Sequence, residues 1–198
     1  MSSEETQNLL IDTAVRLIGE KSSDAITVRE LAREADVNSA AISYYFGGKD
    51  QLIEKAKDVY WQRICEICKQ IEKRTEMTAA DANRYFKQML DFYLSSRGIL
   101  RTEQTDLLRQ GVDSSTSNRI ALQFNAIRHM ILLINPHTPR RLIVARTIRV
   151  FSSLAHPALW VEVYEKTGAT IPLDEMLNLY IEEIVNSILL EDSYATKI

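Results

Sequence analysis

The stretch of sequence that decides the fold covers residues 27–52 and reads TVRELAREADVNSAAISYYFGGKDQL. Thr27 and the glutamate three residues later have the spacing of a capping box, which predicts a helix over residues 28–35. Asn38 is a second candidate N-cap after a three-residue turn, and it predicts a helix over residues 38–44. Two short helices joined by such a turn form a helix-turn-helix, whose second helix lies in the major groove of DNA.

The second of these helices has two different faces. Apolar side chains recur at helical spacing from Ile42 and form a face that packs on the preceding helices. The opposite face holds small, hydroxylic and aromatic side chains, which suit base edges and thymine methyl groups: Ser39, Ala40, Ser43 and Tyr44. Thr27 and Lys49 lie at helix starts, where phosphate is a natural ligand. The predicted DNA-binding residues are Thr27, Asn38, Ser39, Ala40, Ser43, Tyr44, Tyr45 and Lys49.

Outside this stretch, glycine and proline are rare, with six Gly and four Pro among 198 residues. This leaves few of the tight turns that sheets need, and the segments between them have helix lengths. Apolar residues make up 45% and charged residues 26%, as in globular proteins. We therefore expect an all-α protein of about nine helices. The nine expected helices cover residues 4–21, 28–35, 38–44, 49–75, 78–96 and 99–110, then one ending at 134, then 140–155 and 172–190. His156-Pro157 kinks or ends the helix over 140–155, and an additional short helix covers 158–167.

The stretch over residues 27–52 resembles the N-terminal domain of the TetR family of transcriptional regulators. The matching positions are Thr27, Val28, Leu31, Ala32, Ala35, Val37, Ile42, Tyr45, Phe46, Lys49 and Leu52. The sequence departs from the family at Asp36, usually glycine, at Ser43, often aromatic, and at Ser22, where glycine often ends the first helix. The resemblance implies a homodimer, a small-molecule effector pocket in the C-terminal helices, and DNA binding that changes when the effector binds.

On this resemblance we expect a helix-turn-helix DNA-binding domain of three helices over residues 1–60. A helical effector-binding and dimerisation domain would cover residues 61–198, joined to the first by the long helix from residue 49. The protein would be a cytoplasmic, ligand-responsive transcriptional regulator that binds a palindromic operator on double-stranded DNA, a repressor being favoured over an activator. The alternative is a helical enzyme or a protein-interaction domain in which the helix-turn-helix is structural.

Two helices near the C-terminus carry more apolar residues than one core contact needs. A surface helix of a monomer requires an apolar stripe only about 100° wide. We expect the surplus on residues 140–155 and 172–190 to pair with its symmetry mate as a four-helix bundle. The predicted dimer-interface residues are Ile148, Phe151, Leu177, Tyr180, Ile181, Ile184 and Ile188.

An effector pocket is expected among the long helices that follow the DNA-reading segment. Because the helix from residue 49 starts beside that segment, a ligand against its far end could tilt its near end. The candidate lining is mostly apolar, which favours a largely apolar small molecule: Ile64, Cys68, Phe86, Met89, Tyr93, Phe124, Arg128, His129 and Phe151. Helical spacing alone does not separate such a lining from core packing, the default for aromatic residues.

Other kinds of chemistry have little support in the sequence. There is no Gly-rich phosphate loop, HExxH, GxSxG or kinase motif, so we expect no catalytic residue and no enzyme. Cys65 and Cys68 have no second cysteine pair and no clustered histidine, so inert thiols are favoured over a redox or metal site, and no cofactor is expected.

The charge and hydropathy patterns indicate the surroundings of the protein. Residues 1–60 hold seven Lys or Arg and eleven Asp or Glu, a net charge of −4, which predicts weak non-specific DNA affinity. The longest nearly uncharged apolar stretch, residues 130–135, is far below the roughly 20 residues that cross a bilayer. With a polar, acidic start and no signal peptide, the sequence predicts a cytoplasmic protein without a membrane partner.

Overall fold

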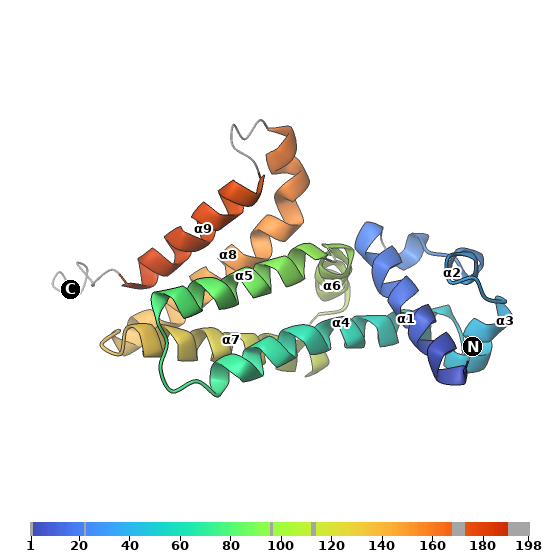
Figure 1. Cartoon of the computed structure of the whole chain (residues 1–198), viewed down its shortest axis with the longest axis horizontal. Helices are drawn as coiled ribbons and strands as arrows, with labels where there is room; N and C mark the ends of the chain where they lie inside the picture. Colours follow the sequence, from blue (N-terminus) through green and yellow to red (C-terminus); the bar gives the residue numbers. More distant parts are fainter. Residues whose placement is uncertain (1, 22, 96, 112–113, 168–172, 190–198) are drawn as a thin grey trace. The chain divides into compact units, whose positions relative to one another are not determined.

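The computed structural model describes residues 2–21, 23–95, 97–111, 114–167 and 173–189, which form helices and the turns that join them (Figure 1). The helices are α1 (Ser3–Glu20), α2 (Val28–Glu34), α3 (Ala40–Phe46), α4 (Lys49–Glu72), α5 (Ala79–Ser95), α6 (Arg97–Gln110), α7 (Ser114–Ile134), α8 (Arg140–Lys166) and α9 (Leu173–Leu189), with a 3-10 turn, η1 (Ser23–Ala25). No strand occurs in these residues, so the predicted all-α fold is confirmed. None of these helices is long and apolar enough to cross a membrane.

The chain divides into two compact units. The first contains residues 1–63 and 95–113, and the second contains residues 64–94 and 114–198. Helix α4 therefore contributes its beginning to the first unit and its end to the second. The predicted boundary at residue 60 lies close to the end of the first segment, but α6 belongs to the first unit as well.

The core of the first unit is built from the apolar stripes of its helices. Leu10, Ala14 and Ile18 recur at helical spacing on α1 and are fully buried. Leu31 of α2 and Ile42 of α3 are fully buried in the same unit. Complete burial of one Leu or Ile side chain contributes about 1.5–3 kcal/mol. These side chains therefore hold α3 in place by its inner face.

Within the first unit, α6 approaches α1 too closely for any side chain at Gly98. A Cβ atom built on Gly98 would lie 1.5 Å from the backbone oxygen of Ile18. Only a residue without a side chain allows the two helix backbones to approach in this way. This close contact explains why α6 belongs with α1 although it is far from α1 in the sequence.

In the second unit, α7 and α8 pack against each other, and α9 packs on both (Figure 1). Phe86 and Met89 of α5, Ile127 and Ile131 of α7, and Leu154 of α8 are fully buried. The core of this unit is thus shared by α5, α7 and α8, together with the end of α4, which contributes Cys68, and α9, which contributes Ile188.

Helix α8 runs without interruption through Pro157, so the predicted break after residue 155 and the separate helix over 158–167 are wrong. Proline lacks the backbone N–H that would bond to the carbonyl four residues earlier, which is the carbonyl of Ser153. In the structure, the Tyr180 hydroxyl of α9 donates a hydrogen bond to this Ser153 oxygen at 3.0 Å. A side chain from a neighbouring helix thus satisfies the carbonyl that Pro157 leaves open, and the helix continues.

Candidate nucleic-acid interface

The turn between α2 and α3 is closed by backbone hydrogen bonds and by one unusual residue. The N–H of Val37 donates to the carbonyl of Ala32 at 2.9 Å, and the N–H of Asp36 donates to that of Arg33 at 3.2 Å. Asp36 has a φ of 51°, in the left-handed region that favours glycine. Aspartate adopts this region more readily than most residues. The departure from the family at this position is therefore accommodated by the backbone.

Helix α3 begins at Ala40, two residues later than predicted. The side-chain oxygen of Asn38 accepts a hydrogen bond from the N–H of Ala40 at 2.8 Å. Asparagine favours such local turns because its side chain imitates a backbone carbonyl. Asn38 was predicted as the N-cap of this helix. The N-cap position is instead occupied by Ser39, whose side chain makes no capping bond, although Asn38 does accept a bond from a backbone N–H at the helix start.

The two faces of α3 lie as the spacing predicted. Ile42 is fully buried, whereas Ser39, Ala40, Ser43 and Tyr44 are all exposed. Tyr44 is 80% exposed, which is unusual for a large aromatic residue. Its ring meets that of the half-buried Tyr45 edge-on, with centroids 4.8 Å apart. The outer face of α3 is therefore a continuous surface of hydroxyl groups, one methyl group and one ring.

Thr27 caps α2, but only half of the predicted capping box forms. The Thr27 hydroxyl accepts from the backbone N–H of Glu30 at 3.2 Å. The Glu30 carboxylate instead accepts a hydrogen bond from Lys21, and this bond holds the pKa of Glu30 below its usual value. The ion pair draws the Glu30 side chain to α1 and away from the helix start. Thr27 itself is exposed at the start of α2.

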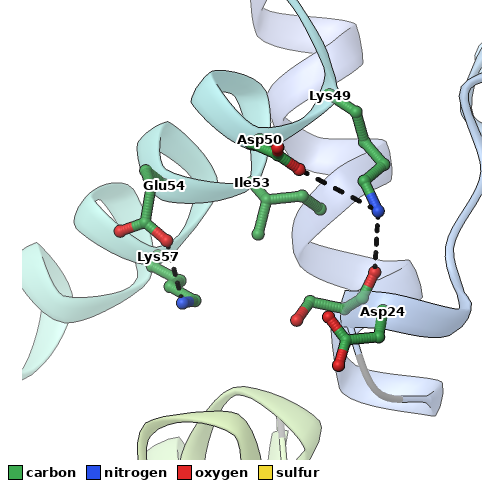
Figure 2. A pocket seen from close by; sticks show the side chains of 7 residues that line it. Asp24, Lys49, Asp50, Ile53, Glu54 and Lys57 are labelled. Atoms are coloured by element: carbon green, nitrogen blue, oxygen red, sulfur yellow. Dashed lines mark hydrogen bonds and ion pairs between the residues drawn. The ribbon is translucent and has the colours of Figure 1, made fainter. Parts of the chain in front are cut away.

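The Lys49 ammonium is engaged with the protein backbone. It donates to the carbonyl oxygen of Ile26 at 3.2 Å. It also donates to the carbonyl oxygen of Ser23 at 3.5 Å and lies 4.0 Å from the Asp50 carboxylate (Figure 2). The Lys49 side chain is 27% exposed. The first turn of α4 is thereby joined to the connection between α1 and α2.

Most basic residues of the first unit up to residue 60 are paired with acids. The ion pairs join Arg16 to Glu20 and Glu34, Lys21 to Glu30, Arg33 to Glu34, and Lys57 to Glu54. Arg29 and Lys55 are exposed and form no ion pair with any residue that the structure describes. Arg29 lies in the first turn of α2, two residues after Thr27. Arg29 was not among the residues predicted from the sequence to bind DNA, because the sequence does not show which basic residues form ion pairs in space.

A polar pocket of about 330 Å³ lies in the first unit and is shown in Figure 2. It is lined by Ser23, Asp24, Lys49, Asp50, Ile53, Glu54 and Lys57. The Lys57 and Glu54 side chains point toward each other and pair at 2.9 Å. None of the predicted effector-binding residues lines this pocket, and its charged lining does not fit an apolar ligand.

The residues predicted to bind an effector are mostly buried in the second unit. Those with 1% exposure or less are Ile64, Cys68, Phe86, Met89 and Tyr93. Phe124 and Phe151 are half-buried, with ring centroids 4.9 Å apart, and His129 Nε2 lies 2.8 Å from the carbonyl oxygen of Arg74. Arg128 is exposed, so the structure gives no support for it as a pocket residue.

A buried polar pair lies among these apolar residues and was only half predicted. The Tyr93 hydroxyl donates to the side-chain oxygen of Gln123, which is 2% exposed, and the Gln123 amide donates to the Arg119 carbonyl at 3.2 Å. Gln123 gave no signal in the sequence because a polar residue in a helix is normally exposed.

The two thiols are embedded in the second half of α4. Burial raises the pKa of Cys68 to about 12 and also raises the pKa of Cys65. Within the described residues, no three His, Cys, Asp or Glu side chains are placed to hold a metal ion.

The predicted dimer-interface residues are divided between core and surface. Leu177, Ile181, Ile184 and Ile188 are at most 8% exposed within the single chain, so their own unit already covers most of their surface. Their stripe on α9 is wide because it packs against more than one helix of its own unit. The two remaining aromatic residues of the set, Phe151 and Tyr180, contact Phe124 and Ser153 of the same chain. Ile148 is 48% exposed.

Comparisons with known proteins agree with this arrangement. Residues 10–56 match the family described as "Bacterial regulatory proteins, tetR family". The probable HTH-type transcriptional regulator YttP of Bacillus subtilis is 42% identical over 57 residues, which are 29% of this chain and 28% of that protein. The HTH-type transcriptional regulator BetI of Brucella anthropi is 52% identical over 44 residues, 22% of this chain and 23% of that protein. The chain thus matches less than a third of the length of these relatives.

Solved structures extend the likeness of fold to nearly the whole chain. A tetR-family transcriptional regulator from Streptomyces coelicolor has a TM-score of 0.63 at 17% identity, covering 96% of this chain and 88% of its own. The TetR family regulator PfmR from Thermus thermophilus has a TM-score of 0.64 at 14% identity, covering 89% and 97%. Residues 10–56 thus match the helix-turn-helix segment of the tetR family of bacterial regulatory proteins, and the described helices share the fold of solved TetR-family structures.

Proposed function

We propose that the protein is a DNA-binding regulator that acts by binding and not by catalysis, and that represses transcription from a palindromic operator. The observation that carries this proposal is the exposed outer face of α3 above its buried Ile42. The inner face of such a helix is fixed by the packed core, and its uncharged outer face fits the major groove. Such a regulator would act in the cytoplasm, where the bacterial chromosome lies.

The first experiment tests α3 itself. Duplexes bound by the purified protein are selected from a random library and measured by gel shift with Tyr44→Ala. Each lost base contact lowers discrimination against the wrong base by about 1–3 kcal/mol. Leu108→Ala is the matched control, because Leu108 is 87% exposed on α6. If Tyr44→Ala keeps the affinity and sequence preference of the parent, α3 is not the reading helix.

Contacts to phosphate are proposed for Thr27, Tyr45 and Arg29. Lys49 was predicted for this role, but its ammonium already donates to two carbonyl oxygens. Because each phosphate contact contributes about 0.9 to the slope of log affinity against log salt, Arg29→Ala in a dimer should reduce the slope by about 1.8. Lys49→Ala should leave the slope unchanged and lower the stability. If Lys49→Ala reduces the salt slope and Arg29→Ala does not, Lys49 is the residue that contacts phosphate.

A homodimer is proposed on the exposed apolar residues of α8 and α9. Val144, Ile148, Trp160 and Val163 of α8 are 42–62% exposed, and Leu179 of α9 is 49% exposed. Large apolar side chains gathered on one pair of helices are typical of an interface. A two-fold axis beside α8 and α9 would bring the same surfaces of two protomers together. The α3 helices of the two protomers would then bind two half-sites of the operator, whose centres lie about 34–36 Å apart or a multiple of that distance.

The dimer is tested by measuring mass in solution. Ile148→Asp places a charge in the proposed interface and should give monomers at micromolar concentration by light scattering. Leu108→Asp changes a leucine of α6 that is even more exposed, at 87% against 48% for Ile148, and should leave the dimer intact. A monomeric parent protein, or a dimeric Ile148→Asp variant, would contradict the assignment.

An effector site is proposed in the second unit, beside the half-buried rings of Phe124 and Phe151. The buried residues predicted to line it, Ile64, Cys68, Phe86, Met89 and Tyr93, are apolar apart from the Tyr93 hydroxyl, which donates to Gln123. Such a composition suits a largely apolar small molecule with one polar group. Binding that favours one orientation of α4 would then change DNA affinity, and a tenfold change corresponds to about 1.4 kcal/mol.

The effector proposal is tested by a screen of apolar compounds. A ligand should raise the unfolding temperature and weaken the gel shift of the selected duplex. Phe124→Ala and Met89→Ala should reduce both effects, whereas Leu108→Ala should not. Ligand effects that survive both pocket substitutions would place the site elsewhere.

A further inference from the structure

The outer face of α3 lacks the residues that read most bases in the major groove. Arg or Lys pairs with guanine, Asn or Gln pairs with adenine through two hydrogen bonds, and Asp or Glu accepts from cytosine. Residues 40–46 read AAISYYF and contain none of these types. The exposed groups are the Ser39 and Ser43 hydroxyls, the Ala40 methyl and Tyr44. Serine hydroxyls can serve either a donor or an acceptor and discriminate little.

One amide lies beside this face, but its oxygen is engaged with the backbone of the chain. The side-chain oxygen of Asn38 accepts from the N–H of Ala40 at 2.8 Å. Recognition of adenine by asparagine needs both the oxygen and the amide nitrogen of the side chain. With its oxygen directed at the Ala40 N–H, Asn38 has its amide N–H groups available, and such a donor can pair with an acceptor on adenine, guanine or thymine.

Apolar contact is therefore the selective chemistry that α3 can offer. Tyr44 is 80% exposed, and its ring is held by an edge-on contact with Tyr45, at 4.8 Å between centroids and 79° between planes. The Ala40 methyl lies one helical turn before it on the same face. The C5 methyl of thymine is the apolar group that a base pair presents in the major groove.

We propose that each operator half-site places A·T pairs under α3, and that Tyr44 and Ala40 select them by contact with thymine methyl groups. This inference rests on the proposed function. It makes Tyr44 a specificity-determining residue that needs its ring and not its hydroxyl. The paired basic residues of the first unit fit the same picture, because little charge is left to hold DNA regardless of its sequence.

The test removes the methyl group from the DNA and the ring from the protein. Each thymine of a selected duplex is replaced in turn by deoxyuridine, which keeps the base pair and its O4 acceptor. At the contacted position we expect about fourfold weaker binding per methyl group, or about 15-fold when both half-sites are changed. At the thymine that Tyr44 contacts, Tyr44→Ala should bind the thymine and deoxyuridine duplexes equally, whereas Tyr44→Phe should still distinguish them; a thymine contacted by Ala40 should stay sensitive in both variants.

The outcomes separate the inference from the proposed function. Selected half-sites with only G·C pairs at the discriminated positions, or duplexes insensitive to deoxyuridine, would overturn the inference while leaving a DNA-binding protein. Discrimination that is lost in Tyr44→Phe would overturn it too, because the hydroxyl would then be the reader. Failure to enrich any duplex would overturn the proposed function, and the inference with it.

Discussion

The hydrogen bond from the Tyr180 hydroxyl to the Ser153 carbonyl lets α8 continue through Pro157. Tyr180→Phe keeps the ring and removes the donor, so the Ser153 carbonyl loses its partner. A buried carbonyl without a partner costs about 1–3 kcal/mol. Both residues are half-buried, and water can replace part of the bond. We therefore expect a loss of about 1 kcal/mol, which lowers the midpoint temperature of a chain of this size by about 2–4 °C.

The assay is urea unfolding at a fixed protomer concentration, in parent and Pro157→Ala backgrounds. Alanine at position 157 restores the backbone N–H, so Ser153 regains its helical donor. In that background Tyr180→Phe should cost less than half of its cost in the parent, a coupling of about 0.5–1 kcal/mol between the two sites.

Tyr164→Phe is the matched control for this cycle. The Tyr164 hydroxyl lies 3.0 Å from His156 Nδ1 on the surface of α8, and its loss should change the stability by less than about 0.5 kcal/mol. If Tyr180→Phe costs the same in both backgrounds, its hydroxyl does not compensate for Pro157, and the reasoning is refuted.

Three further predictions concern other parts of the chain. Gly98→Ala should lower the unfolding free energy by at least about 3 kcal/mol in urea titration, because its methyl would lie 1.5 Å from the Ile18 oxygen; a loss below about 1 kcal/mol would contradict this. The hydrogen bonds that start α5 lower the pKa of Asp81, so its contribution to stability is present above about pH 5 and is lost as pH falls below the ordinary aspartate pKa of about 3.9; Asp81→Asn should reduce the stability difference between pH 7 and pH 3. Because burial raises the pKa of Cys68 to about 12, this thiol should resist a thiol reagent at pH 8 until the protein unfolds, while Cys65 reacts first. The labelled sites are identified by peptide mass mapping, and rapid labelling of both cysteines in the native protein would disprove the prediction.

The sequence was sufficient to predict those features that depend on the residues of a single helix. The outer face of α3 follows from the spacing of Ser39, Ser43 and Tyr44, and burial of Ile42 follows from the same period. The α2 start follows from Thr27, since its hydroxyl accepts from a residue only three positions away. These features depend on neighbours in the sequence.

Features that depend on contacts between distant segments could not be predicted. The donor that rescues α8 lies 27 residues from the carbonyl it serves. The apolar width of α9 indicates how much surface is covered, but not whether its own chain or a second copy covers it. Lys49 gives no sign in the sequence that its ammonium bonds to carbonyls 23 and 26 residues away. Arg29, which forms no ion pair with a described residue, is distinguished from its paired neighbours only in three dimensions.

The bonds from the Lys49 ammonium to the Ser23 and Ile26 carbonyls also affect how the first unit opens. The connection between α1 and α2 and the first turn of α4 share one cation, so neither can unfold locally without breaking the anchor of the other. Their slowest backbone amides should therefore exchange with solvent deuterium as one cooperative group, with a common opening free energy. Removing the ammonium by Lys49→Met would let the two segments exchange independently, each at its own rate.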